Sequence, residues 1–398
     1  MAPAYDAVVS ASGPENPFEG LPFLGDLAKM LQSSGPVSWD AARQFAVQVA
    51  TDGQPESNPD PLERIAFEEL ARVAEMRVAD ITGLSTSTTG HVVTVLPVTR
   101  SEWARRALDG WRPLLERLST SLSAAGAAGQ GETDDDPLVS LLQGFSAAFG
   151  PLLFGMQAGA MVGHLATRSL GQYDLPIPRP PSDELVVVST NVAEFGESWS
   201  LPVDDLRLWI CLSELTTHAV LGVPHVRQRL EELLFEYAGG FSVDPAALES
   251  RLGEVDPTDP NALQQALGDP SVLLGAIQSP AQQQLLPRVD ALIASIVGYV
   301  DWVMDTLGES LISSYGMLTE ALRRRRVEAG QGETFVGHLL GLEIDQSQYE
   351  RGERFIAGIV ERAGPEALTR LWATERELPT PNELDAPGLW LARIDLPD

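Results

Sequence analysis

Apolar side chains recur every three or four residues along most of this 398-residue chain, a spacing typical of amphipathic helices. In one such stretch Ile65, Leu70, Val73 and Met76 lie near one helical face. Only Leu185-Val-Val-Val188 has the composition of a strand. The pattern predicts a mainly α-helical protein with little β-structure. The expected helices cover residues 39–51, 60–84, 101–123, 204–221, 226–237, 280–307 and 310–328.

The segment 137–167 contains no Asp, Glu, Lys or Arg, and Gly155, Gly159 and Gly163 follow one another at four-residue spacing. Such a segment could cross a membrane, where glycines let helices approach closely. A helix buried on all sides of a large core is also apolar all round. Because Pro151 and Gln157 interrupt the apolar run, we expect a buried helical hairpin and no membrane span.

The residues 124–136 begin with Ala and Gly and end in Thr-Asp-Asp-Asp, a composition typical of a solvated loop. The aspartates lack the alternating spacing and closing Glu of a calcium loop. We therefore expect a flexible linker at 124–137 between an N-terminal helical region, 1–123, and a helical core, 138–398. Whether the two regions form separate domains or one continuous domain stays open.

Charge and cysteine content limit the partners and the kinds of site that can be expected. Fifty-six acidic against 27 basic side chains give a net charge of −29, which repels phosphate backbones, so nucleic acid is not expected as a partner. Cys211 is the single cysteine, which excludes an internal disulfide. No apolar leader is visible near Met1, so we expect a cytoplasmic protein. The run Arg323–Arg326 suits a solvated helix C-terminus better than an anion site.

The segment with candidate chemistry is the predicted helix at 204–221. Zinc proteases carry His-Glu-x-x-His on a helix, where two imidazoles hold the metal and the Glu activates its water. Here the five residues are Ser213-Glu-Leu-Thr-Thr217, so the Glu is present and both ligand positions carry hydroxyls. His218 comes one residue too late, rotated by about 100° from Thr217.

At this helix the chain resembles the actinobacterial zincin-like family, whose members are known as zinc-dependent metalloproteases or hydrolases. The resemblance covers nearly the whole sequence and rests on several motifs besides the 208–224 helix. They are Asn16-Pro-Phe18, Met156-Gln-Ala-Gly-Ala-Met-Val-Gly-His-Leu-Ala166, Gly171-Gln-Tyr-Asp-Leu-Pro176, Gly298-Tyr-Val-Asp-Trp-Val-Met-Asp305, Arg323-Arg-Arg-Arg326, Tyr349-Glu-Arg-Gly-Glu-Arg-Phe355, Leu378-Pro-Thr380 and Trp390-Leu-Ala-Arg393.

The resemblance implies a zincin-like helical scaffold with a degenerate site. Metal-binding members have His at the positions of Ser213 and Thr217, and Glu at the position of Val297. Hydroxyls are poor zinc ligands, so we expect no zinc here. Glu214 would then be a vestigial general base. The chain would act as a binding or scaffold pseudoenzyme for an unknown protein or peptide, through the former substrate cleft.

Two other interpretations remain. In the first, Glu214 and His218 hold zinc together with an acidic residue near 297–305, Asp301 or Asp305, in a rearranged hydrolase site. In the second, Cys211, Glu214 and His218 share a helix face as a thiol–imidazole arrangement. Two turns of helix separate Cys211 from His218 by about 10 Å, too far for direct proton transfer.

Overall fold

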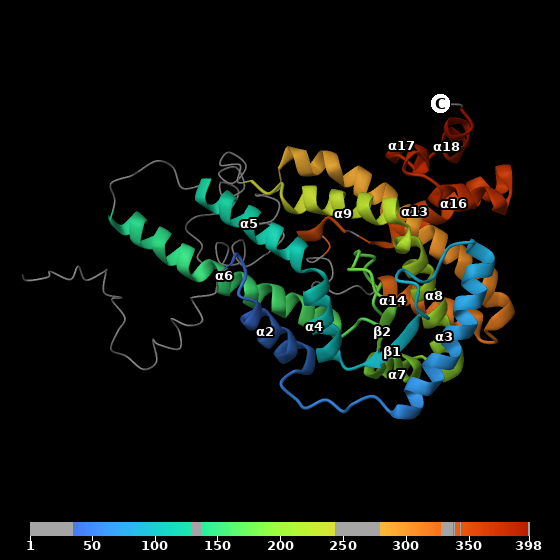
Figure 1. Cartoon of the computed structure of the whole chain (residues 1–398), viewed down its shortest axis with the longest axis horizontal. Coiled ribbons are helices and arrows are strands. Elements are labelled where there is room, and N and C mark those ends of the chain that lie inside the picture. The colour runs from blue at the N-terminus through green and yellow to red at the C-terminus, as the bar shows by residue number, and fades with distance from the viewer. Residues whose placement is uncertain are drawn as a thin grey trace, which may run out of the picture.

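The fold comes from a computed structural model, which describes residues 35–128, 137–242, 279–327 and 337–396 except 338 and 343. Helices dominate it, and the strands are short, so the mainly α-helical prediction is confirmed (Figure 1). The longer helices are α2 (Trp39–Thr51), α3 (Pro61–Thr82), α4 (Arg100–Gly110), α5 (Arg112–Ala128), α6 (Pro137–Ala166), α7 (Ser189–Ser198), α8 (Val203–Gly222), α9 (Pro224–Ala238), α13 (Pro280–Leu311), α14 (Tyr315–Val327) and α16 (Gln346–Ala363). The chain then continues through η1 (Pro365–Trp372), η2 (Glu375–Glu377), α17 (Pro381–Leu384) and α18 (Pro387–Ile394).

The two strands, β1 (Thr94–Val98) and β2 (Glu184–Val188), pair in parallel, with Thr94 opposite Glu184 and Val98 opposite Val188. The sequence predicted the second strand and missed the first. Pro97 obscures the apolar run of β1, because proline cannot donate to a ladder and is found mainly on edge strands. Within a pair of strands every strand is an edge, so Pro97 is tolerated.

Helix α3 begins with a side-chain cap, because Asp60 accepts a hydrogen bond from the Leu62 backbone N–H at 2.8 Å. It buries the face of Phe67, Ala71 and Val78. The face chosen from the sequence is the wrong one, since Ile65 and Met76 are 51% and 53% exposed. Large apolar residues lie on both faces of α3, and the face that packs closely is the one that also carries small alanines.

The predicted helix 101–123 is two helices, α4 and α5, which meet at Trp111. Pro113 explains the break, because it has no N–H for a bond to residue 109 and its ring clashes with that carbonyl. Helix α5 then continues through Ala128, so the first residues of the predicted linker are helical. The acidic part of that linker, 129–136, lies outside the described residues.

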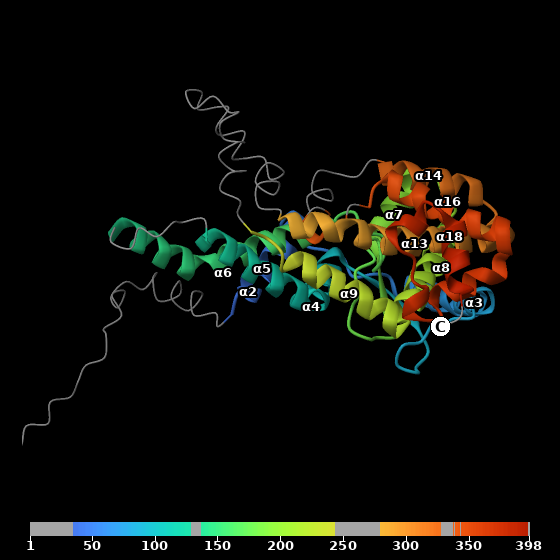
Figure 2. The same ribbon diagram turned by 90° about the horizontal axis from the view of Figure 1, so that it is seen from above.

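Helix α6 is one continuous helix, so the predicted hairpin at 137–167 is wrong. Glycines four residues apart stay on one helical face, and here that face lies against α2. A Cβ on Gly159 would overlap the Ala42 carbonyl, and one on Gly163 would lie 2.6 Å from the Ala46 oxygen. In both views the N-terminal half of α6 extends away from the other helices (Figures 1 and 2).

Helix α13 lies at the centre of the molecule. It contributes Val297 to the larger hydrophobic core, which also contains residues of α2, α4, α5, α6 and α9. It contributes Val300 and Met304 to the smaller core, which lies around α3, α8 and the strands. Among the described helices, α13 alone is long and apolar enough to cross a membrane, and 72% of its most apolar window is buried. That burial is typical of a central core helix.

Candidate functional site

The segment with the candidate chemistry lies on α8, whose first turn carries Asp204 and Asp205 against the positive end of the helix dipole. Thr217 is 6% exposed, and its hydroxyl donates to the Ser213 carbonyl at 3.0 Å. Thr216 makes the same kind of bond to Leu212. The threonine hydroxyls of this helix are therefore satisfied within it.

Ser213, Thr217 and Val297 line one small cavity of about 50 Å³. Ser213 and Thr217 lie one turn apart on α8, and Val297 faces them from α13. The structure thus brings together the three positions at which the resemblance places metal ligands. In this chain those positions offer two hydroxyls and an isopropyl group, a set that does not fit zinc.

The same cavity is lined by two acidic side chains, and arginines pair with both. Asp301 forms a bidentate ion pair with Arg326, at 2.8 and 2.9 Å. Asp174 pairs with Arg325 at 2.8 Å. A carboxylate held by a guanidinium fork is a poor candidate for a metal ligand, because the cation would have to displace the arginine.

Glu214 is absent from the cavity lining. Its carboxylate accepts backbone N–H bonds from Gln172 at 2.9 Å and Tyr173 at 3.1 Å. It is 5% exposed, and burial, followed by the nearby Asp174 carboxylate, raises its pKa to about 8 against the pull of those two donors. A Cβ on Gly171 would overlap the carboxylate. Glu214 thus holds the segment 171–173.

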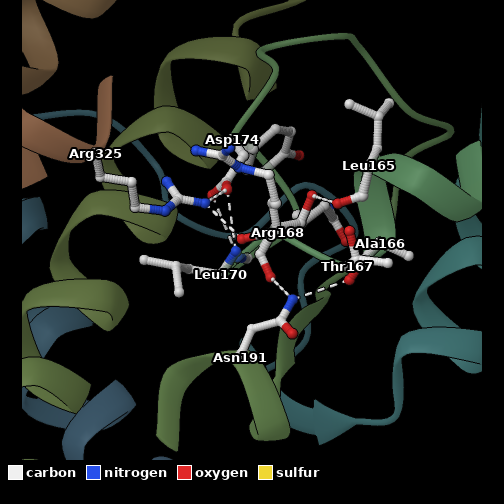
Figure 3. Close-up of polar contacts among 12 residues, drawn as sticks. Leu165, Ala166, Thr167, Arg168, Leu170, Asp174, Asn191 and Arg325 are labelled. Carbon is white, nitrogen blue, oxygen red and sulfur yellow. Dashed lines mark hydrogen bonds and ion pairs between the residues drawn. The ribbon is translucent and has the colours of Figure 1, made fainter. Parts of the chain in front are cut away.

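Other groups hold the residues on either side of this segment (Figure 3). Arg325 reaches both the Asp174 carboxylate and the Arg168 carbonyl, and the Asn191 amide donates to Ala166 and Ser169. Trp103 donates from its indole to the Gly171 carbonyl at 2.8 Å. The segment that faces Glu214 is therefore fixed in place.

Comparison of the whole chain with known proteins gives its family and a solved structure with the same fold. The model of the zincin-like metallopeptidase family matches residues 37–391. The chain belongs to this family. A crystal structure from Chloroflexus aurantiacus, named a "putative hydrolase with a novel fold", has the same fold with a TM-score of 0.63 and 24% identity, over 91% of this chain and 100% of that one. No curated protein matches the chain in sequence.

In this zincin-like protein His218 is buried beside Tyr173, whose hydroxyl lies 2.9 Å from the imidazole Nδ1. Burial lowers the pKa of His218 to about 4, so the ring is neutral near pH 7. Its Nε2 has no hydrogen-bond partner among the described residues. Burial also raises the pKa of the Cys211 thiol, which disfavours the thiolate that a thiol–imidazole pair requires.

The rearranged metal site would need Glu214 and His218 together with Asp301 or Asp305. Asp301 is paired with Arg326, and Asp305 accepts a hydrogen bond from the Tyr315 hydroxyl at 2.6 Å. Over the described part of the chain, no three His, Cys, Asp or Glu side chains are grouped so that they could hold a metal ion. The structure does not bring the four candidates together.

Sequence reasoning missed the residues that surround the site. Tyr173, Asp174, Arg326 and Tyr349 line the small cavity and belong to motifs that carried the family resemblance, but no role followed from them. The available signal was Gly171-Gln-Tyr-Asp174, a polar motif that begins four residues after the long uncharged segment 137–167. Chemistry-bearing residues after an apolar helix are candidates for a site at its end.

Proposed function

We propose that this zincin-like protein has lost zinc and peptide hydrolysis at the family site and acts by binding a protein or peptide. One observation carries the proposal: Ser213, Thr217 and Val297 line one cavity and supply no imidazole, thiolate or carboxylate to it. Zinc in proteins is held by three or four such groups.

The surroundings of Glu214 support the same conclusion. A general base must reach the water that it activates, and this carboxylate instead accepts backbone bonds from Gln172 and Tyr173. Both donors belong to the segment 171–173, which Trp103 holds at the Gly171 carbonyl and which is followed directly by Asp174, the partner of Arg325. The role that these contacts support for Glu214 is to position that segment.

A larger cleft of about 710 Å³ adjoins the cavity and shares Asp174, Arg326 and Tyr349 with it. Its walls combine apolar side chains, such as Leu165 and Leu342, with Arg325. Ligand sites of proteins are commonly 300–1,000 Å³ and mix apolar walls with a few polar groups. This cleft is where we expect the partner to bind.

A metal-dependent hydrolase remains the second candidate, because the relative from Chloroflexus aurantiacus is named a hydrolase. In this chain it would require His218 to leave Tyr173 and Asp301 to leave Arg326. These rearrangements unpair polar groups that are buried, as His218 is, or half-buried, as Asp301 and Arg326 are, and an unsatisfied buried group costs about 1–3 kcal/mol. The binding function needs no such change.

The zinc content of protein purified without chelator tests the proposal, together with hydrolysis of a mixed peptide pool. We expect well under one zinc per chain and no cleavage above that of His218→Ala, a variant without the remaining imidazole of α8. Stoichiometric zinc that survives dialysis and is lost in His218→Ala would support the rearranged hydrolase instead. Zinc that is retained by His218→Ala would point to a third site and leave the cavity assignment intact.

A further inference from the structure

A second pocket, of about 200 Å³, lies next to the small cavity and is enclosed by α8, α13, α14 and α16. Its walls include three half-buried aromatic residues, Trp209, Trp302 and Tyr315. Met304 and Ile356, 2% and 1% exposed, complete the apolar part. The pocket therefore offers aromatic side chains to a ligand of side-chain size.

Two of the rings that line this pocket, Tyr315 and Trp302, are held in place. A Cβ on Gly308 would overlap the Tyr315 ring, so the ring packs directly on the α13 backbone. The Tyr315 hydroxyl is bonded to Asp305. Trp302 packs beside Tyr299 with ring centroids 5.9 Å apart. Fixed rings lose little conformational entropy when a ligand binds.

The charged groups of the pocket are three carboxylates and two guanidiniums. Asp301 and Arg326 neutralise each other in their bidentate pair. Among the described residues, the group that Asp305 pairs with is the neutral hydroxyl of Tyr315. Glu353 and Arg323 are exposed, and neither has a hydrogen-bond or ion-pair partner within the described ranges. One negative charge is left unbalanced, in a protein whose net charge is −29.

One wall of the pocket already contains a cation that lies beside an aromatic ring and a carboxylate. The Arg326 guanidinium lies 3.8 Å from the centre of the Tyr349 ring and is paired with Asp301. A cation above an aromatic face and beside a carboxylate gains from both contacts. The second pocket offers the same two kinds of group, and no side chain of the described chain fills it.

We infer that this pocket receives a lysine or arginine side chain from a partner protein. The inference rests on the proposed binding function and gives it a partner class, a protein segment with a basic residue. The cation would lie against Trp209 and Trp302, with Glu353 and Asp305 as counter-ions. Anionic side chains would meet those two carboxylates with only Arg323 free to pair with them.

The test uses the full chain labelled with 5-fluorotryptophan, whose eight tryptophans each give one fluorine resonance. Trp209→Phe and Trp302→Phe assign the two resonances of the pocket. The probes are blocked pentapeptides with a central Lys, Arg, norleucine or Glu between glycines, titrated into the millimolar range. We expect the Lys and Arg peptides to shift the Trp209 and Trp302 resonances, with norleucine several-fold weaker and Glu inactive.

Two exposed variants give effects of opposite sign without touching the core. Glu353→Gln is expected to weaken binding of the Lys peptide about threefold, and Arg323→Gln to strengthen it by a similar factor, as for an exposed ion pair. The matched control is Glu361→Gln, a carboxylate on the same helix with 83% of its side chain exposed, which should change nothing.

If Glu353→Gln instead strengthens binding of the Lys peptide and Arg323→Gln weakens it, the pocket is an anion site and the inference is overturned. A Glu peptide that binds more tightly than the Lys peptide would overturn it as well. Absence of any shift at Trp209 and Trp302 with every peptide would overturn it as well. The zinc measurement is independent of these results. A zinc-free protein that ignores basic peptides leaves the proposed function in place, whereas zinc dependent on His218 refutes that function whichever peptide binds.

Discussion

Two neighbouring cavities share Asp301 and Arg326 and differ in nearly everything else. The one at Ser213 and Thr217 measures about 50 Å³, and its carboxylates are paired with arginines. The one at Trp209 measures about 200 Å³, and at its edge Glu353 and Arg323 are exposed and have no partner in the described part of the chain. The comparison indicates that the same two helices, α8 and α13, position a site without usable metal ligands and a pocket suited to recognition.

The largest effect is expected from rebuilding the metal site in the small cavity. Ser213→His and Thr217→His add two imidazoles one helical turn apart, and Val297→Glu adds a carboxylate from α13. Structural zinc sites contribute about 10–16 kcal/mol of binding free energy, so even half of the lower figure tightens zinc binding by about a thousandfold or more. The measurement is zinc titration of the triple variant against the parent.

Circular dichroism controls for folding of the triple variant, because the imidazoles are larger than the groups that they replace. A matched variant with only Val297→Glu should bind zinc no better than the parent, since one carboxylate does not make a site. A folded triple variant that also binds no better would mean that 213, 217 and 297 do not converge closely enough to share an ion.

The next largest effect is expected on the free energy of unfolding, from a change at Gly171, which packs against the Glu214 carboxylate. Gly171→Ala should destabilise the fold by about 2–3 kcal/mol, because the new Cβ overlaps the Glu214 carboxylate and displaces it from Gln172 and Tyr173. Urea unfolding measures the change. Gly316→Ala on α14 is the control, since a Cβ there meets nothing within 4 Å. Equal stability of the two variants would contradict the tight contact.

The pKa values of the buried pair predict how stability depends on pH. The folded protein keeps the Glu214 proton up to about pH 8, and the unfolded chain loses it near its ordinary pKa of 4.5. Stability therefore falls as pH rises through this window. For His218, with a folded pKa of about 4 against 6.5, stability rises with pH between those values. Above pH 6.5 only the Glu214 effect remains.

We expect the free energy of unfolding to fall by up to about 2 kcal/mol between pH 6.5 and 8. Glu214→Gln should remove most of that slope, and Glu353→Gln, an exposed carboxylate of the other pocket, should leave it unchanged. Urea midpoints across this pH range measure both. A slope that survives in Glu214→Gln would assign the titration to another group.

The sequence predicted the helices well where local signals were strong, and the site only in part. Helix 39–51 matches its predicted bounds, because it has an acidic first turn and a Gly-containing turn after it. The place of Val297 opposite Ser213 came from family resemblance, since spacing along the chain does not say which helices face each other. The bonds from Gln172 and Tyr173 to Glu214 were beyond prediction, because backbone donors leave no mark in the sequence.

The smallest expected effects compare one hydroxyl in each region. In the buried region the Tyr173 hydroxyl is bonded to His218 Nδ1 at 2.9 Å, and in the open pocket the Tyr315 hydroxyl is bonded to Asp305 at 2.6 Å. Tyr173→Phe leaves a buried imidazole nitrogen without a partner, which costs about 1–2 kcal/mol. Tyr315→Phe leaves a carboxylate that water can reach, so we expect a loss of about 0.5 kcal/mol at most.

Urea unfolding of both variants at pH 7 gives the two values. The same substitution removes the same atom in each case, so the difference measures only the surroundings of the acceptor. If the two losses are equal, or if Tyr315→Phe costs more, then the open pocket is as rigidly bonded as the buried site and the contrast drawn between them fails.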